Sequence, residues 1–215
     1  AGHLMAASVM SAPAALVRAK LRVPEVGAPK TAGRVKLHVE PDTANHSDAA
    51  ASGAGVGLQL ALNVAAMLLA FIALIYMFNG MLGWVTGLMG IEGLTFEVIL
   101  GWLLSPLAWL MGVSWADAST VASLMGVKTV LNEFFAYDMM AKAVQGGEFV
   151  HARSVVITTY ALCGFANFGS IAIQIGGIGS IAPSRRADLA KLGIKAMIGG
   201  TLAAFMTATV AGLMI

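Results

Sequence analysis

Residues 163–180 read "CGFANFGSIAIQIGGIGS", an uncharged apolar stretch that nevertheless carries five glycines, an asparagine, a glutamine and two serines. A glycine costs up to about 1 kcal/mol relative to alanine inside a helix. We therefore expect the helix that contains this stretch to break at 164–169. The alternative for the glycines, above all for those in 176–180, is close packing between helices, where small residues are common in membrane proteins.

The composition of the chain is that of a membrane protein. Hydrophobic residues make up 58% of its 215 residues, charged residues 11%, and the mean hydropathy is +0.82; a soluble domain carries about 25% charged residues. Four stretches lack Asp, Glu, Lys and Arg: 49–91, 98–116, 154–184 and 196–215. Because a bilayer span needs about 20 mainly apolar residues, we expect an all-α polytopic membrane protein. The net charge of +2 gives no sign of a nucleic-acid partner.

The polarity of the sequence changes at a few points that divide the chain. The expected parts are the tail of a preceding transmembrane helix at 1–20, a cytoplasmic linker at 21–52, and a helical part at 53–215 made of a span at 56–85, an interfacial helix at 95–112, a hairpin at 115–145, a broken helix at 150–182 and a last helix at 188–215. The alternative for 95–112 is a span kinked at Pro106. The opening segment lacks the basic start of a signal peptide, so we expect a fragment that begins inside a helix.

Lysines and arginines indicate the orientation, because they are enriched in cytoplasmic loops. They gather in the 21–52 linker and in the 184–195 loop, whereas 79–97 carries only acidic charges. We expect the first two segments to be cytoplasmic and the third to lie outside. Both ends of 115–145 then lie outside as well.

The segment 115–145 is too short to cross a bilayer twice. It contains Lys128, Glu133 and Asp138, which a single lipid-facing span would not tolerate. If Gly126 divides it, each half is a helix of roughly 15 to 22 Å. We therefore expect a re-entrant hairpin whose tip, near 126–134 ("GVKTVLNEF"), reaches the middle of the bilayer.

The predicted break in the next helix lies at a similar depth. Asn167 would lie roughly 21 Å along the helix from Arg153 and roughly 27 Å from Arg185, and Gly164 and Gly169 bracket it. A break here frees half-helix ends at the midplane, where transporters bind substrates and ions. The pattern is therefore that of a transport site at the break, with close packing between helices as the alternative.

Several motifs resemble those of the concentrative nucleoside transporters. The stretch "GVKTVLNEFFAY" (126–137) is similar to the signature G-x-K-x-x-x-N-E-F-V-A-Y of that family, with Phe135 where the family more often has valine. The stretches 163–173 and 179–212 resemble the family's last two helices. Earlier segments are similar to preceding parts of the family in the same order, so that the resemblance covers nearly the whole chain.

The resemblance implies a nucleoside–cation symporter of the plasma membrane (the inner membrane in a Gram-negative cell), built on an inverted repeat and assembled as a homotrimer in membrane lipid. The chain would be the second repeat plus the tail of the first. The site for the coupling cation, Na⁺ or H⁺, would lie outside it, and no other cofactor and no metal site are implied. Glu133 would bind the ribose, and Phe165, Asn167 and Ser170 would contact the ribose or the base. The supporting motif residues would be Gly126, Lys128, Asn132, Gly164 and Gly169.

Three alternatives remain open from the sequence. Glu133 could be a structural partner of Lys128 and not a ligand-binding group, although their spacing is poor for a helix. The chain could be a non-transporting membrane subunit or an inactive remnant. An intramembrane aspartyl protease is suggested by Tyr137-Asp138, but the second acid that it needs is missing, so we do not expect an enzyme.

The remaining ionisable residues receive simple interpretations. The histidines at 3, 38, 46 and 151 share no metal-ligand spacing. Asp117 and Glu148 are expected to be solvated ends of the hairpin.

Overall fold

The computed structural model describes residues 2–27, 44–91 and 93–215, and over these ranges the chain is helical without any strand. The helices are α1 (Gly2–Arg22), α2 (His46–Leu88), α3 (Phe96–Leu110), α4 (Trp115–Val130), α5 (Glu133–Gln145), α6 (Ala152–Leu162), α7 (Phe168–Ile181) and α8 (Arg186–Leu213), with a short 3₁₀ turn at Pro183–Arg185 before α8. The predicted all-α fold is confirmed.

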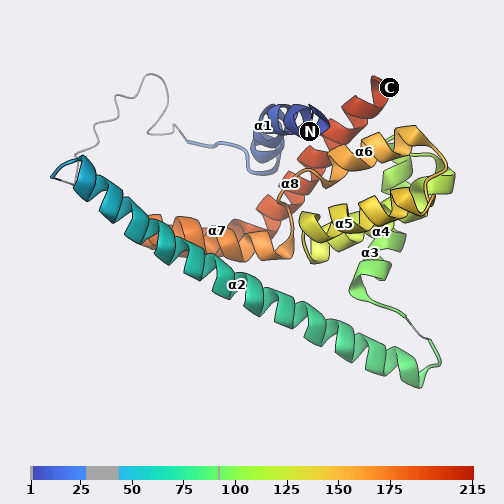
Figure 1. The fold of residues 1–215 in the computed structure, drawn as a ribbon, viewed down its shortest axis with the longest axis horizontal. Helices are drawn as coiled ribbons and strands as arrows, with labels where there is room; N and C mark the ends of the chain where they lie inside the picture. Colours follow the sequence, from blue (N-terminus) through green and yellow to red (C-terminus); the bar gives the residue numbers. More distant parts are fainter. Residues whose placement is uncertain (1, 28–43, 92) are drawn as a thin grey trace.

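The helices form one group around the hairpin α4–α5 and a second group around α7 and α8 (Figure 1). The hairpin α4–α5 lies beside α3 and α6, and α4 packs along the length of α3. The long helix α2 runs past this group and contacts α7 over its first half, while α8 lies against α1, α6 and α7. The hairpin and the break between α6 and α7 therefore lie in the middle of the fold.

The core is formed by side chains from α1, α3, α4, α6 and α8, many of them alanines, and α4 lies at its centre. Val121, Ala122 and Met125 are fully buried there, against Ala108 of α3 and Ile157 of α6. Small residues let helices approach closely, which is how membrane helices gain packing energy without a hydrophobic driving force between them. This packing fixes the position of α4 and hence of the hairpin tip.

The predicted break in the 150–182 segment is present. Helix α6 ends at Leu162, the backbone turns at Cys163 with φ −74° and ψ 90°, and α7 begins at Phe168. The glycines in 176–180 lie within α7 and do not interrupt it. A Cβ atom added at Gly177 would lie 3.5 Å from Leu60 of α2. This close approach supports the packing alternative for the second glycine cluster.

The hairpin turns within the expected tip at 126–134, but later than Gly126. Gly126 is buried inside α4, and the turn lies at Leu131 and Asn132. The prediction that Gly126 divides the hairpin is wrong, because asparagine is among the best N-capping residues and its side chain at 132 accepts a hydrogen bond from the N–H of Phe135 at 3.1 Å. A glycine within a packed helix, in contrast, costs little when neighbouring helices fill the space around it.

Other boundaries also shift. Helix α1 continues to Arg22 and α2 begins at His46, so both ends of the predicted 21–52 linker are helical. Residues 28–43 of that linker lie outside the described residues. Helix α3, at 15 residues, is roughly 22 Å long, which is short for a bilayer core of about 30 Å. Its length favours the interfacial interpretation of 95–112.

Among the described residues, two helical segments are long and apolar enough to cross a membrane: Gly2–Arg22 and Pro183–Leu213. Shorter apolar stretches occur at Ile72–Leu88, Val98–Leu110 and Phe168–Gly179. Length and composition alone make the first two segments candidates for membrane spans.

Candidate functional site

Two helices begin side by side at the centre of the fold, one in the hairpin and one after the break. Each start is capped by an asparagine: the side chain of Asn132 accepts from the N–H of Phe135 in α5, and the side chain of Asn167 accepts from the N–H of Ser170 in α7 at 2.7 Å. The N-terminus of a helix carries a partial positive charge. The two starts therefore favour a negative or hydrogen-bond-accepting group between them.

The predicted site residues Glu133, Asn167 and Ser170 form one hydrogen-bonded cluster. The Asn167 Nδ2 group donates to Glu133 Oε2 at 3.0 Å, and the Ser170 hydroxyl donates to Asn167 Oδ1 at 2.9 Å. All three side chains are buried. The other carboxylate oxygen of Glu133, Oε1, is buried and has no hydrogen-bond partner among the described residues.

An aromatic pair lies next to this cluster. The rings of Phe134 and Phe165 meet edge to face with centroids 6.1 Å apart. Each residue is about two-thirds exposed, at 70% for Phe134 and 68% for Phe165. The structure thus brings all four predicted binding residues together, and it adds Phe134, which the sequence analysis missed although it lies in the quoted signature.

Lys128 is completely buried one turn before the hairpin tip. Its ammonium donates to the backbone carbonyl of Ala161 at 3.1 Å and lies 5.8 Å from the ring centroid of Phe205. No ion pair joins it to Glu133 in the described part of the chain, although the two charges attract at longer range. The direct pairing considered from the sequence is therefore not formed.

The supporting glycines differ in their surroundings. A Cβ atom added at Gly164, within the break, would lie 3.9 Å from the Lys128 ammonium and 3.4 Å from the Ala204 methyl group. Gly169 lies in the first turn of α7. A Cβ atom at Gly164 would therefore make only ordinary van der Waals contacts with these two groups.

A cavity of about 480 Å³ borders the break on the side of α1 and α8. Phe165, Ser170 and Gln174 line it, together with Ser11 of α1 and Gly193 and Gly200 of α8. Two of the predicted binding residues thus line this space, whereas Glu133 and Asn167 do not.

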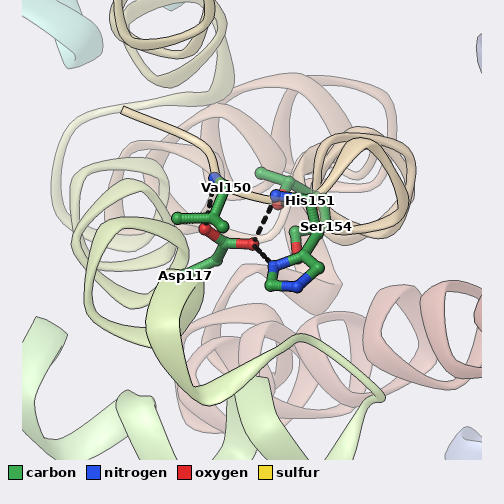
Figure 2. Close-up of polar contacts among 5 residues, drawn as sticks. Asp117, Val150, His151 and Ser154 are labelled. Atoms are coloured by element: carbon green, nitrogen blue, oxygen red, sulfur yellow. Dashed lines mark hydrogen bonds and ion pairs between the residues drawn. The ribbon is translucent and has the colours of Figure 1, made fainter. Parts of the chain in front are cut away.

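At the end of the hairpin opposite its tip, Asp117 in the first turn of α4 is hydrogen-bonded to the segment before α6 (Figure 2). This carboxylate accepts from the N–H of Val150 at 2.8 Å, the N–H of His151 at 3.2 Å and the His151 ring nitrogen Nδ1 at 3.1 Å. Burial disfavours its charged form, but the hydrogen bonds outweigh that effect and hold the pKa of the Asp117 carboxyl below its ordinary value. The expectation of a solvated Asp117 is wrong, because the acid is fully buried and fastens the start of α4 to the segment that leads into α6.

The described residues contain no group of three or more His, Cys, Asp or Glu side chains that could hold a metal ion. Asp138, on which the protease alternative depends, is an exposed residue that pairs with Lys142 at 2.6 Å.

Comparison with known proteins identifies the family. Residues 3–212 match the family described as Na⁺ dependent nucleoside transporter C-terminus. The chain is 50% identical over 214 residues to the uncharacterized transporter YutK of Bacillus subtilis, covering 99% of the chain and 52% of YutK. It is 45% identical over 225 residues to solute carrier family 28 member 3 of Mus musculus, covering 99% of the chain and 32% of that protein.

The structural comparison agrees. The solved structure of a CNTnw variant in its intermediate 3 state superposes with a TM-score of 0.86 at 48% identity, over 99% of the chain and 51% of that structure. The chain therefore spans about half of that structure and of YutK, and about a third of the mouse protein. These relatives are transporters and not enzymes, which removes the protease alternative. The chain belongs to the family of Na⁺-dependent nucleoside transporters, and it corresponds to their C-terminal part.

Proposed function

We propose that the protein to which this chain belongs takes up nucleosides across the plasma membrane by symport with Na⁺, and that this chain supplies one half of the nucleoside site. The family match over residues 3–212 supports the substrate class and the cation. The coupling cation binds outside the chain, and the described residues offer no acidic or histidine cluster for it.

One observation carries this proposal: the unpaired oxygen of Glu133. A buried polar atom without a partner costs about 1–3 kcal/mol, and here it is the Oε1 atom of a carboxylate whose other oxygen is held by Asn167. Such an atom is explained if a ligand hydroxyl donates to it. Charge-assisted hydrogen bonds of this kind are roughly twice as strong as neutral ones.

The neighbouring groups suit a nucleoside. The ribose supplies hydroxyl donors for Glu133, and the hydroxyl and amide groups of Ser170 and Asn167 both donate and accept. The aromatic pair of Phe134 and Phe165 offers exposed apolar surface on which the base can stack. Polar groups at one end and aromatic rings at the other give the ligand a single orientation.

The membrane arrangement is part of the same proposal. The hairpin α4–α5 enters the bilayer from the outside and returns, with its tip at Leu131 and Asn132 near the middle. The segment 21–52 and the basic segment 184–195, which includes the first turns of α8, lie in the cytoplasm. Three copies assemble into a homotrimer in the plasma membrane, or in the inner membrane of a Gram-negative cell.

The test compares two nucleosides in two variants of the full-length protein. Competition for labelled uridine uptake is measured with unlabelled uridine and with 2′,3′-dideoxyuridine, which lacks the ribose hydroxyls. Glu133→Gln should weaken uridine about 10- to 150-fold, as expected for a lost charge-assisted bond, and should weaken the dideoxy compound much less. Asp138→Asn is the matched control, because Asp138 is an exposed acid on the same hairpin.

Equal losses for the two compounds in Glu133→Gln would show that Glu133 supports the hairpin and does not bind the ribose. The alternative of an inactive remnant is tested separately. The coding sequence upstream of residue 1 should encode a first repeat with its own hairpin, and a stop codon there would favour the remnant.

A further inference from the structure

The broken helix leaves the last carbonyl groups of α6 without partners inside the helix. The last four carbonyls of any helix have no partner within it, and here they belong to residues 159–162. They form the negative end of the α6 dipole. In transporters with broken helices, such ends commonly coordinate a free cation.

In this chain, the hairpin supplies the partners for these carbonyls. The Tyr137 hydroxyl of α5 donates to the carbonyl of Thr159 at 2.8 Å, and the Lys128 ammonium of α4 donates to the carbonyl of Ala161 at 3.1 Å. The N–H of Cys163 donates to the carbonyl of Tyr160 at 3.1 Å. One donor from each arm of the hairpin therefore closes the end of the half helix.

The surroundings of the Lys128 ammonium are those of a cation site. The side chain has no exposed surface, the Phe205 ring lies 5.8 Å away, and the Glu133 carboxylate attracts the charge from a longer distance. The glycine at 164 leaves its backbone next to the ammonium. A carbonyl, an aromatic ring face and a carboxylate all stabilise a positive charge.

We propose that the Lys128 ammonium is a built-in monovalent cation, which occupies the carbonyl end of α6 in place of a free ion. Its four-carbon stem comes from α4, so the cation also ties the hairpin to the break. The tie holds the start of α7 opposite the start of α5, and thereby Asn167 next to Glu133. Lys128 is accordingly a positioning residue, and this half of the site takes up no ion of its own.

The role of the Lys128 charge in stability does not depend on the proposed nucleoside uptake. Only the expected change in nucleoside affinity rests on that proposed function. The proposed role of Lys128 makes a distinctive prediction. Shortening Lys128 to alanine should leave an empty space lined by a carbonyl, an aromatic ring and a nearby carboxylate, which a small free cation can enter. Replacing it by methionine should remove the charge while filling the space, so that no cation can substitute.

The experiment uses the purified full-length protein in detergent, with Lys128→Ala, Lys128→Met and the matched controls Lys142→Ala and Lys142→Met. Lys142 is an exposed lysine of the same hairpin. Thermal unfolding is recorded at constant ionic strength in choline, sodium, potassium or methylammonium chloride, and each variant is compared with the wild type in the same salt.

Both Lys128 variants should unfold at a lower temperature than the wild type in choline. Methylammonium or a small alkali cation should raise the unfolding temperature of Lys128→Ala towards that of the wild type but should not raise that of Lys128→Met. The Lys142 variants should unfold at the wild-type temperature in every salt. Uridine affinity, measured in parallel by equilibrium binding, should fall about tenfold or more in Lys128→Met and recover with the same cation in Lys128→Ala.

Two results would overturn the proposal. One is a Lys128→Met protein that unfolds and binds uridine as the wild type does, because the charge would then be unnecessary. The other is a Lys128→Ala protein that is equally unstable in all four salts, because Lys128 would then contribute packing alone. If the wild type binds no uridine, the proposed function fails, while the salt dependence of unfolding still tests Lys128.

Discussion

Replacing Asn167 separates its two roles, capping α7 and holding Glu133. Its Oδ1 atom accepts from the N–H of Ser170 at 2.7 Å, and its Nδ2 group donates to Glu133 at 3.0 Å. Asn167→Ser keeps a good cap but is too short to reach the carboxylate. Asn167→Ala loses both interactions. Asn167→Asp keeps the cap but places a second negative charge next to the Glu133 carboxylate.

The expected magnitudes follow from these contacts. A hydrogen bond to a charged group contributes about 1.5–3 kcal/mol, and this is the most that the positioning of Glu133 by Asn167 can add to uridine binding, so Asn167→Ser should weaken that binding by up to roughly 10- to 150-fold. Asn167→Asp should weaken it further, because like charges at hydrogen-bond distance repel. The lost cap should make Asn167→Ala less stable than Asn167→Ser by about 0.5–2 kcal/mol.

The assay measures uridine binding to the full-length protein by equilibrium titration and stability by thermal unfolding. The refuting result is an Asn167→Ser protein with wild-type uridine affinity, which would show that the bond across the break does not hold the site. If the serine and alanine variants were equally stable, the cap seen at the start of α7 would be energetically unimportant.

Four further outcomes are expected. Gly193→Ala should lower the unfolding temperature, because its new Cβ atom would lie 2.6 Å from Ile171 Cγ2, whereas Gly199→Ala, with nothing within 4 Å, should not; overpacking costs about 1–3 kcal/mol, and equal unfolding temperatures would contradict this packing. Tyr137→Phe should cost about 1 kcal/mol in thermal unfolding through the carbonyl of Thr159 that it leaves unpaired; an unchanged unfolding temperature would show that this bond contributes nothing. The lowered pKa of Asp117 stabilises the folded state above the unfolded pKa of about 3.9 and ceases to do so as the pH falls through the folded value, so Asp117→Asn should be less stable at neutral pH and lose less on acidification than Asp138→Asn, and parallel pH profiles of unfolding would refute this. A cysteine placed at Lys191 should resist membrane-impermeant reagents applied to intact cells, and efficient labelling would refute the proposed orientation.

The sequence by itself determined the class of fold and the position of the break. Charge-free apolar stretches indicate which segments lie in the bilayer, and clustered basic residues indicate which loops are cytoplasmic. Each segment can be assigned from its own residues, because the bilayer acts on each segment separately. Local motifs were equally readable: the glycines that bracket Asn167 predicted the break between α6 and α7, and the signature at 126–137 contained Glu133 and Lys128. These features depend on residues that are close in the chain.

Only the tertiary structure decided which groups those residues meet. The tip of the hairpin was predicted within 126–134 and lies there, but the division into two helices was predicted at Gly126 and falls at Leu131 and Asn132, because packing against α3 and α6 keeps α4 helical through the glycine. Lys128 was considered as a partner for the nearby Glu133, yet it donates to the carbonyl of Ala161. Asp117 was expected in solvent, yet it is buried against the N–H groups of 150 and 151. In the last two cases the partner is a backbone group more than 30 residues away, and since every residue carries the same backbone groups, the sequence contains no signal that could reveal such a partner.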